Sequence, residues 1–256
     1  MATPEALNAS AAEERMASNP IEAARRRLIV ALDVPDAAHA RALVGRLQDT
    51  CRWFKVGLEL YIAAGPSILE LLAARGYSVF LDLKLHDIPN TVAGAVRCAA
   101  KLGARLLSLH AAGGPAMLAA AREALEGIAH PPQLLAVTVL TSMDPAELRA
   151  VGLDRAPAEQ VAILARAGLD AGIRGFVCSP REVACLRALT GPEGVLVVPG
   201  IRPAGAAAGD QKRIATPAEA LRAGAGYLVV GRPITQAPDP AAAAEAVLKE
   251  MAEALQ

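Results

Sequence analysis

Short apolar runs rich in Val, Leu and Ile recur along the chain, and longer amphipathic segments separate them. Most of the runs lack polar alternation, which is typical of parallel strands that are buried on both faces. Eight such β/α units predict an α/β protein with a single-domain (β/α)8 TIM barrel. A doubly wound open sheet is the alternative, but no GxGxxG or Walker A sequence follows the first run. The runs occupy residues 28–32, 53–57, 78–83, 104–110, 134–140, 175–179, 195–199 and 227–231.

Several of the intervening segments open with helix-capping sequences. SPRE (179–182), TPAE (216–219) and DPAE (144–147) each combine an N-cap side chain, proline at the first helical position and glutamate at the third. After a further cap at Asp239, apolar residues recur at i+4 spacing from 243 to 255. This spacing predicts a final helix that packs one stripe against the outside of the barrel.

Composition narrows the classes of partner. Lys and Arg number 26 and Asp and Glu number 26, so the chain has no net charge, and only 3% of its residues are aromatic. A neutral chain lacks the field that holds a nucleic-acid backbone or an anionic membrane, and few aromatics argue against a base-stacking platform. No apolar run reaches the roughly 18 residues of a membrane span. We therefore expect neither a nucleic-acid partner nor a membrane.

The cysteines and the N-terminus indicate a cytoplasmic protein. Cys51, Cys98, Cys178 and Cys185 form no CxxC pair and no zinc-finger spacing, which favours reduced thiols in a chain of this length. Residues 1–18 carry acids and lack the apolar core of a secretory signal. We interpret them as a polar tail and residues 19–256 as the barrel domain.

Charged residues gather where the first apolar runs end. Asp33 follows the first run, Lys55 lies in the second, and the third leads into Asp82, Lys84 and Asp87. In a (β/α)8 barrel these ends meet at the mouth that holds the active site. Asp82 and Lys84 are two residues apart, so on a strand they point to the same face. Burying them is costly unless Asp33, Lys55 and Asp87 supply alternating partners, and we interpret this network as catalytic rather than merely structural.

Two segments with glycine and arginine follow the last two runs. They are PGIRP (199–203) and GRPI (231–234). The loops after strands 7 and 8 are the frequent phosphate site of this fold, where glycines let backbone N–H groups approach the anion and arginine adds a charged fork. The ligand is therefore predicted to be a phosphorylated small molecule.

In combination, these motifs resemble the orotidine 5′-phosphate decarboxylase family over about residues 20–255. The DxKxxD core alone is shared with the hexulose-phosphate synthase and keto-gulonate-phosphate decarboxylase branch, whereas the HDIPNT continuation, Lys55 and the two phosphate loops make the resemblance specific. It implies decarboxylation of orotidine 5′-monophosphate to UMP, the last step of de novo UMP biosynthesis, with no cofactor and no metal. The motifs are ALD (31–33), KVG (55–57), DLKLHDIPNT (82–91), VTVLTSM (137–143), PGIRP (199–203), GDQKR (209–213) and VVGRPIT (229–235).

The resemblance also implies catalytic roles. Lys84 matches the acid whose ammonium stabilises the carbanion at C6 of the pyrimidine and then protonates it. Asp82 matches the carboxylate beside the departing CO₂. Asp33 and Lys55 match members of the network that contact the ribose.

The remaining matched positions bind the substrate or complete a partner's site. Asp87, Ile88 and Thr91 match residues that reach across the two-fold interface of a homodimer, and Thr141 matches a contact to the pyrimidine. The positions that match the phosphate loops are Pro199, Arg202, Gln211, Gly231 and Arg232.

Two histidines lie at the predicted mouth of the barrel, and two other functions are compatible with parts of these motifs. We expect His86 to be structural within its loop, while His110 is left open between packing and support of the site. With two of the carboxylates they could form the metal site of a sugar-phosphate epimerase or lyase, but the two lysines would repel the ion. A non-catalytic sensor of a phosphorylated ligand would keep the phosphate loops and would not need the charged network.

Overall fold

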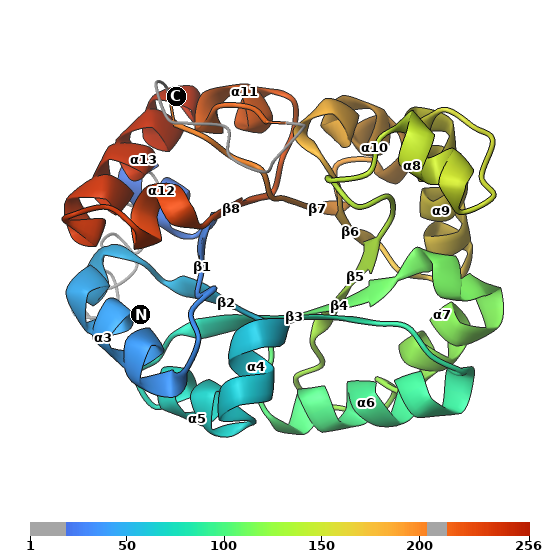
Figure 1. Ribbon diagram of the computed structural model, residues 1–256, viewed down its shortest axis with the longest axis horizontal. Helices are drawn as coiled ribbons and strands as arrows, with labels where there is room; N and C mark the ends of the chain where they lie inside the picture. The colour runs from blue at the N-terminus through green and yellow to red at the C-terminus, as the bar shows by residue number, and fades with distance from the viewer. Residues whose placement is uncertain (1–18, 204–213) are drawn as a thin grey trace, which may run out of the picture.

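The computed structural model describes residues 19–203 and 214–256, which form a closed barrel of parallel strands (Figure 1). The strands are adjacent in sequence order, and β8 closes the barrel by pairing with β1. The predicted (β/α)8 barrel is thus confirmed, and the open sheet is wrong. The strands are β1 Leu28–Ala31, β2 Trp53–Gly57, β3 Ser78–Leu85, β4 Leu106–His110, β5 Gln133–Val137, β6 Gly175–Val177, β7 Val195–Val198 and β8 Tyr227–Val230.

The helices form an outer ring around the barrel (Figure 1). Three short 3₁₀ turns accompany them: η1 Gln48–Thr50, η2 Ala111–Gly113 and η3 Pro180–Glu182. The α-helices in the described ranges are α2 Pro20–Arg25, α3 Ala37–Leu47, α4 Leu58–Ala64, α5 Ser67–Ala73, α6 Pro89–Lys101, α7 Gly114–Glu123, α8 Pro145–Ala150, α9 Pro157–Asp170, α10 Val183–Thr190, α11 Pro217–Arg222, α12 Arg232–Thr235 and α13 Pro240–Ala254.

The predicted helix starts are confirmed, with one change of form. At α8 the carboxylate of Asp144 accepts two backbone hydrogen bonds, and Glu147 accepts one from the N–H of Asp144. Thr216 and Glu219 form the same reciprocal pair at α11. The third start is the 3₁₀ turn η3, which leads into α10. These caps satisfy amides that the first turn of a helix leaves without a partner.

The last helix packs as predicted on a slightly different stripe. Its buried side chains recur at both i+3 and i+4, because one face of a 3.6-residue helix needs both spacings. Of the predicted stripe, Val247 and Met251 are buried, whereas Ala243 and Leu255 are only half-buried. The buried face of α13 consists of Pro240, Ala244, Val247, Leu248, Met251 and Ala252.

An apolar plug fills the interior of the barrel. Its side chains come from the inward faces of six strands, and partly buried residues of the same interior, including Trp53 and Tyr227, pack against it. Such layers make the interior of a (β/α)8 barrel a packed core rather than a pore. We call this set the interior plug: Ile29, Ala31, Phe80, Leu106, Leu135, Val197 and Val229.

The cysteines form no disulfide. All four cysteines are free, and burial raises the pKa of Cys51 to about 12, so this thiol behaves as a small core residue. Among the described helices, none combines the length and the apolar character that crossing a membrane requires.

Candidate active site

The carboxyl ends of the strands surround a cavity of about 620 Å³, which we call the catalytic cavity. Loops after β1, β5, β7 and β8 contribute to its lining together with β2 and β3. Active sites of (β/α)8 barrels occupy this end of the fold. The residues that the sequence predicts here and that line the cavity are Asp33, Lys55, Asp82, Lys84, Thr141, Pro199, Arg202, Gly231 and Arg232.

Four of these side chains form an alternating row of charges. The ammonium of Lys55 lies 2.8 Å from Oδ1 of Asp33 and 3.6 Å from Oδ2 of Asp82. The ammonium of Lys84 lies 2.9 Å from each carboxylate oxygen of Asp82. Each charge inside the row therefore contacts a charge of opposite sign, which offsets the cost of removing it from water.

Asp82 lies at the centre of this row and is nearly buried, with 7% of its surface exposed. Burial alone would raise its pKa, but the ammonium groups of Lys55 and Lys84 outweigh burial and hold the pKa below its usual value. Hydrogen bonds from Lys84 and from the hydroxyl of Ser108, at 2.8 Å, act in the same direction. Asp82 is therefore a carboxylate at neutral pH.

Lys84 reaches the row through an irregular backbone. Its φ is +50°, in the left-handed region, and the pairing of β3 with β4 shifts register between Leu81 and Leu85. The N–H of Lys84 donates to the hydroxyl of Ser108 at 2.9 Å. Lys84 and Asp82 do line the same cavity, as the sequence predicts, but simple strand alternation is the wrong reason, because a bulge re-aims the lysine.

The row also needs a glycine beside it. A Cβ atom on Gly57 would stand 2.8 Å from the ammonium of Lys55 and 3.3 Å from Oδ1 of Asp33. Real Cβ atoms do not approach that closely, so a side chain here would displace the lysine. In the KVG motif, Gly57 therefore leaves the space that the ammonium group of Lys55 occupies.

Two arginines stand elsewhere in the same cavity. Arg202 is 8% exposed, and its guanidinium donates to the carbonyl of Ile201 at 2.9 Å. Burial and the nearby guanidinium of Arg232 lower the pKa of Arg202. The loop from β7 to Arg202 turns at Gly200, whose φ of +78° favours glycine. Two like charges held this close create a region that stabilises an anion.

Comparison with known proteins identifies the family. A model described as the orotidine 5′-phosphate decarboxylase / HUMPS family matches residues 26–247. The chain belongs to this family. The matched range includes all eight strands and every residue that lines the catalytic cavity.

Individual members of the orotidine 5′-phosphate decarboxylase family agree with this match. The enzyme of that name from Moorella thermoacetica is 54% identical over 234 residues, covering 89% of this chain and 93% of its own. That from Anaeromyxobacter sp. strain K is 56% identical over 222 residues, covering 86% and 96%. The crystal structure of orotidine 5′-phosphate decarboxylase from Lactobacillus acidophilus superposes with a TM-score of 0.77 at 40% identity and covers 88% of this chain and 98% of its own.

Some predicted residues lie away from the catalytic cavity, although the family match includes them. Asp87 and Ile88 line a separate surface depression, and the carboxylate of Asp87 accepts a hydrogen bond from the N–H of Ile88 at 2.6 Å. Thr91 is exposed on the first turn of α6. The prediction that Asp87 joins the row of charges is therefore wrong within one chain. Gln211 lies outside the described residues.

The two histidines lie beside the row rather than in it. The rings of His86 and His110 are 5.4 Å apart, and neither residue lines the catalytic cavity. Burial, and then His86 and Lys84, lower the pKa of His110, so its imidazole is neutral at pH 7. Within the described ranges, no three His, Cys, Asp or Glu side chains converge on a point that could hold a metal ion. The ligand set of the epimerase alternative is therefore not assembled in this part of the chain.

Ser108 is the functional residue that the sequence interpretation missed. It lies on β4, is fully buried, and its hydroxyl joins Asp82 to the backbone of Lys84. The available signal was a single hydroxyl inside an apolar strand, two residues before His110 and therefore on the same face. Ser142 and Gln236, which also line the catalytic cavity, carry no such signal.

Proposed function

We propose that the chain catalyses the cofactor-independent decarboxylation of orotidine 5′-monophosphate to UMP, the last step of de novo UMP biosynthesis. The observation that carries the proposal is one cavity that combines the Asp33–Lys55–Asp82–Lys84 row with Arg202 and Arg232. The row suits a reaction that develops negative charge on carbon, and the arginines suit a phosphate. Family membership and the names of the closely similar relatives support the same reaction.

Lys84 is the proposed catalytic acid. When the bond between C6 and the carboxylate breaks, its electron pair stays on C6 and CO₂ leaves. An ammonium already fixed beside that carbon stabilises the charge without the reorganisation that water would need. Lys84 then donates a proton to C6, which gives UMP, and recovers a proton from solvent. Its two 2.9 Å contacts with Asp82 support a fixed position for the ammonium.

Asp82, Lys55 and Asp33 are proposed to position the reacting groups. Because the pKa of Asp82 is lowered, this residue remains charged, holds the ammonium of Lys84 and faces the departing carboxylate. Asp33 is 59% exposed at the side chain, which leaves it open to the ribose hydroxyls, and Lys55 bridges it to Asp82. In the proposal, Thr141, which lines the same cavity, contacts the pyrimidine.

The phosphate is proposed to bind between the loops that follow β7 and β8. Arg202 and Arg232 supply positive charge there, and Pro199 and Gly231 line the same part of the cavity. We also assign Gln211 to this loop from its matching motif. Binding energy gained at the phosphate can assist the reaction at C6, because it can drive closure and exclude water around the row.

We further propose a homodimer in which each chain completes its partner's site. Asp87, Ile88 and Thr91 would enter the partner's catalytic cavity, and their position on the surface supports this role. Ile88 is 66% exposed, which leaves its apolar side chain free to pack against a partner chain. The proposed location is the cytoplasm, where free thiols such as Cys98 and Cys185 remain reduced.

The reaction can be tested by following the loss of ultraviolet absorbance of orotidine 5′-monophosphate with the full-length protein in the presence of EDTA. We expect turnover to continue under chelation and to fall by at least about 10³-fold in Lys84→Ala, because the proton donor and the stabilising charge are both lost. Lys101→Ala, on α6 outside the catalytic cavity, is the matched control and should keep the wild-type rate.

Three results would contradict the proposed function. The first is no turnover of orotidine 5′-monophosphate by the folded wild-type protein. The second is turnover that stops with EDTA and returns with Zn²⁺ or Mg²⁺, which would favour the metal-dependent sugar-phosphate alternative. The third is a near-wild-type rate in Lys84→Ala, which would remove the proposed acid while leaving the substrate in place.

A further inference from the structure

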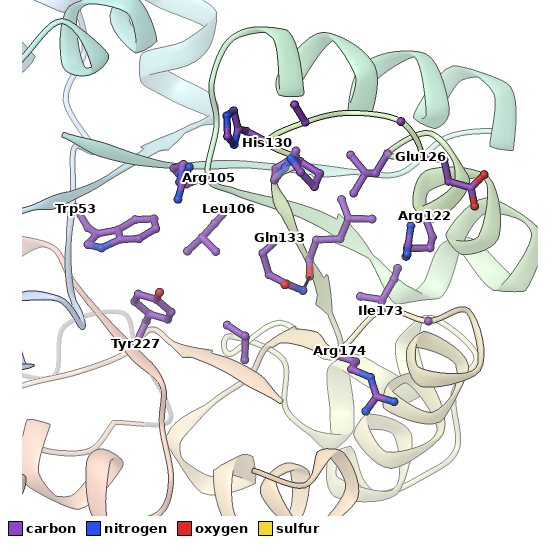
Figure 2. A pocket seen from close by; sticks show the side chains of 18 residues that line it. Trp53, Arg105, Leu106, Arg122, Glu126, His130, Gln133, Ile173, Arg174 and Tyr227 are labelled. Atoms are coloured by element: carbon purple, nitrogen blue, oxygen red, sulfur yellow. Dashed lines mark hydrogen bonds between the residues drawn. The ribbon is translucent and has the colours of Figure 1, made fainter. Parts of the chain in front are cut away.

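A second cavity, of about 820 Å³, lies at the opposite end of the barrel (Figure 2). The first residues of β2, β4, β5, β7 and β8 line it, together with the end of α7 and the loop that follows, and it shares no lining residue with the catalytic cavity. The interior plug lies between the two, since Leu106 faces this cavity while Phe80 and Val229 face the other. We call it the amino-end cavity.

The lining of the amino-end cavity is positively charged. Arg105, Arg122 and Arg174 line it, and Glu126 is the one carboxylate in the lining. None of these arginines forms an ion pair with a carboxylate in the part of the chain that the structure describes. In a chain with no net charge, three arginines around one hollow are a local excess that attracts an anion.

One wall of the same cavity is aromatic. The rings of Trp53 and Tyr227 meet edge to face with centroids 5.2 Å apart, and both side chains are only partly buried. In Figure 2 this pair lies on one side of the cavity, Arg122 and Arg174 lie on the other, and Arg105 lies near the aromatic pair. The chain has one tryptophan and few other aromatics, so their meeting at this cavity is a specific feature.

We propose that the amino-end cavity binds a ligand that joins a planar ring to phosphate groups, as a nucleotide does, at a site separate from the decarboxylation. The ring packs against Trp53 and Tyr227, and the phosphates accept hydrogen bonds from Arg122 and Arg174. Arg105, beside the aromatic pair, contacts either the ring or the first phosphate. The volume of the cavity falls in the usual range for small-molecule sites.

Trp53 is the only tryptophan and lines this cavity, so its fluorescence responds to a ligand bound here. We would titrate the full-length protein with ATP, and separately with pyrophosphate, which lacks a ring. We expect a saturable change in emission with ATP and weaker binding of pyrophosphate. In Arg122→Ala/Arg174→Ala the midpoint for ATP should rise by at least about tenfold, because two charge-assisted contacts are lost. Arg149→Ala, on α8, is the matched control and should bind as wild type.

The catalytic cavity also suits nucleotides, so the titration is repeated in Arg232→Ala, which changes that cavity alone. The proposal requires that the ATP response remain in this variant. It is overturned if wild type gives no saturable change with millimolar ATP, if the double variant binds ATP as wild type does, or if the response is lost in Arg232→Ala. An unchanged rate of decarboxylation in the double variant shows that it is folded. Should that variant misfold, the titration of Arg232→Ala decides alone.

Discussion

Lys84 adopts a left-handed backbone, with φ of +50°, that residues other than glycine rarely take. Such a conformation costs about 1–3 kcal/mol and persists only where the surroundings fix it. Here the N–H of Lys84 is held by Ser108 and its ammonium by Asp82. Because Ser108 bonds both Lys84 and Asp82, one hydroxyl sets the relative position of the proposed acid and its carboxylate.

Replacing Ser108 tests this arrangement. In Ser108→Ala we expect kcat to fall by about 10²-fold with a much smaller change in KM, since misplacing a reacting group costs about that much. The pKa of Asp82 should rise, because the hydrogen bond from Ser108 helps to lower it. The acid limb of the pH–kcat profile should therefore move to higher pH. A purely structural role for Ser108 would leave that limb in place.

Ser108→Cys serves as the control for packing. Its volume is close to that of serine, but a thiol is a weak hydrogen-bond donor, so its acid limb should resemble that of the alanine variant. Wild-type kcat and an unchanged acid limb in both variants would show that the hydroxyl does not position the site.

At the scale of the elements, much of the fold could be predicted because strands that are buried on both faces are continuous apolar runs. Not all strands begin and end where the apolar runs do. β3 continues two residues beyond its run to Leu85, while β5 ends at Val137 although its predicted run extends to Leu140. Strand limits depend on contacts between strands, which the sequence pattern does not contain. β5 ends where its pairing with β4 ends, and the bulge in β3 depends on a contact with Ser108 on β4.

The parts of the site that could be predicted are those that strand topology positions. Asp33 follows β1, Lys55 lies at the middle of β2 and Asp82 lies in the carboxyl-terminal half of β3, so the barrel topology alone brings them to one cavity. Asp87 belongs to the loop after β3, and nothing in the spacing of DxKxxD shows that this loop turns away from the cavity of its own chain. A position that depends on a loop direction or on a second chain is not encoded by strand periodicity.

The last helix offers a prediction at the level of one element. The carboxylate of Asp239 accepts hydrogen bonds from the N–H groups of Ala241 and Ala242 at 3.0 and 3.1 Å. Asp239→Ala should lower the free energy of unfolding by about 1 kcal/mol, because the cap is lost. Asp239→Asn keeps the oxygen and should stay near wild type. Urea unfolding measures both, and equal stability of Asp239→Ala and wild type would contradict the role of the cap.

At the scale of the molecule, zero net charge conceals a separation of charges between the two ends of the barrel. The carboxyl end holds an alternating row of acids and lysines with two arginines in the same cavity, and the amino end holds three arginines around an aromatic pair. The interior plug lies between them. Each end therefore presents its own local field to ligands, which the total charge does not report.

The proposed dimer leads to a complementation test. Lys84→Ala and Asp87→Ala should each be nearly inactive as homodimers. Co-expressed, they should regain up to about a quarter of wild-type activity, because half of randomly paired two-fold dimers are mixed and each mixed dimer has one intact site of two. Decarboxylation by the purified mixture measures this.

The matched control pairs Lys84→Ala with Asp82→Ala. Both residues line the cavity of their own chain, so no mixed dimer of these two variants has an intact site. If the pair with Asp87→Ala also stays inactive when mixed, Asp87 does not act on the partner's substrate.

The interior plug also decides how molecules enter and leave. Because Ile29, Phe80 and Val197 fill the barrel below the row of charges, the described residues close the catalytic cavity toward the amino end of the barrel. In the proposed reaction, the substrate, the departing CO₂ and the proton that recharges Lys84 therefore all pass through the carboxyl end of the barrel. A change that obstructs this end should slow substrate entry, CO₂ release and reprotonation together.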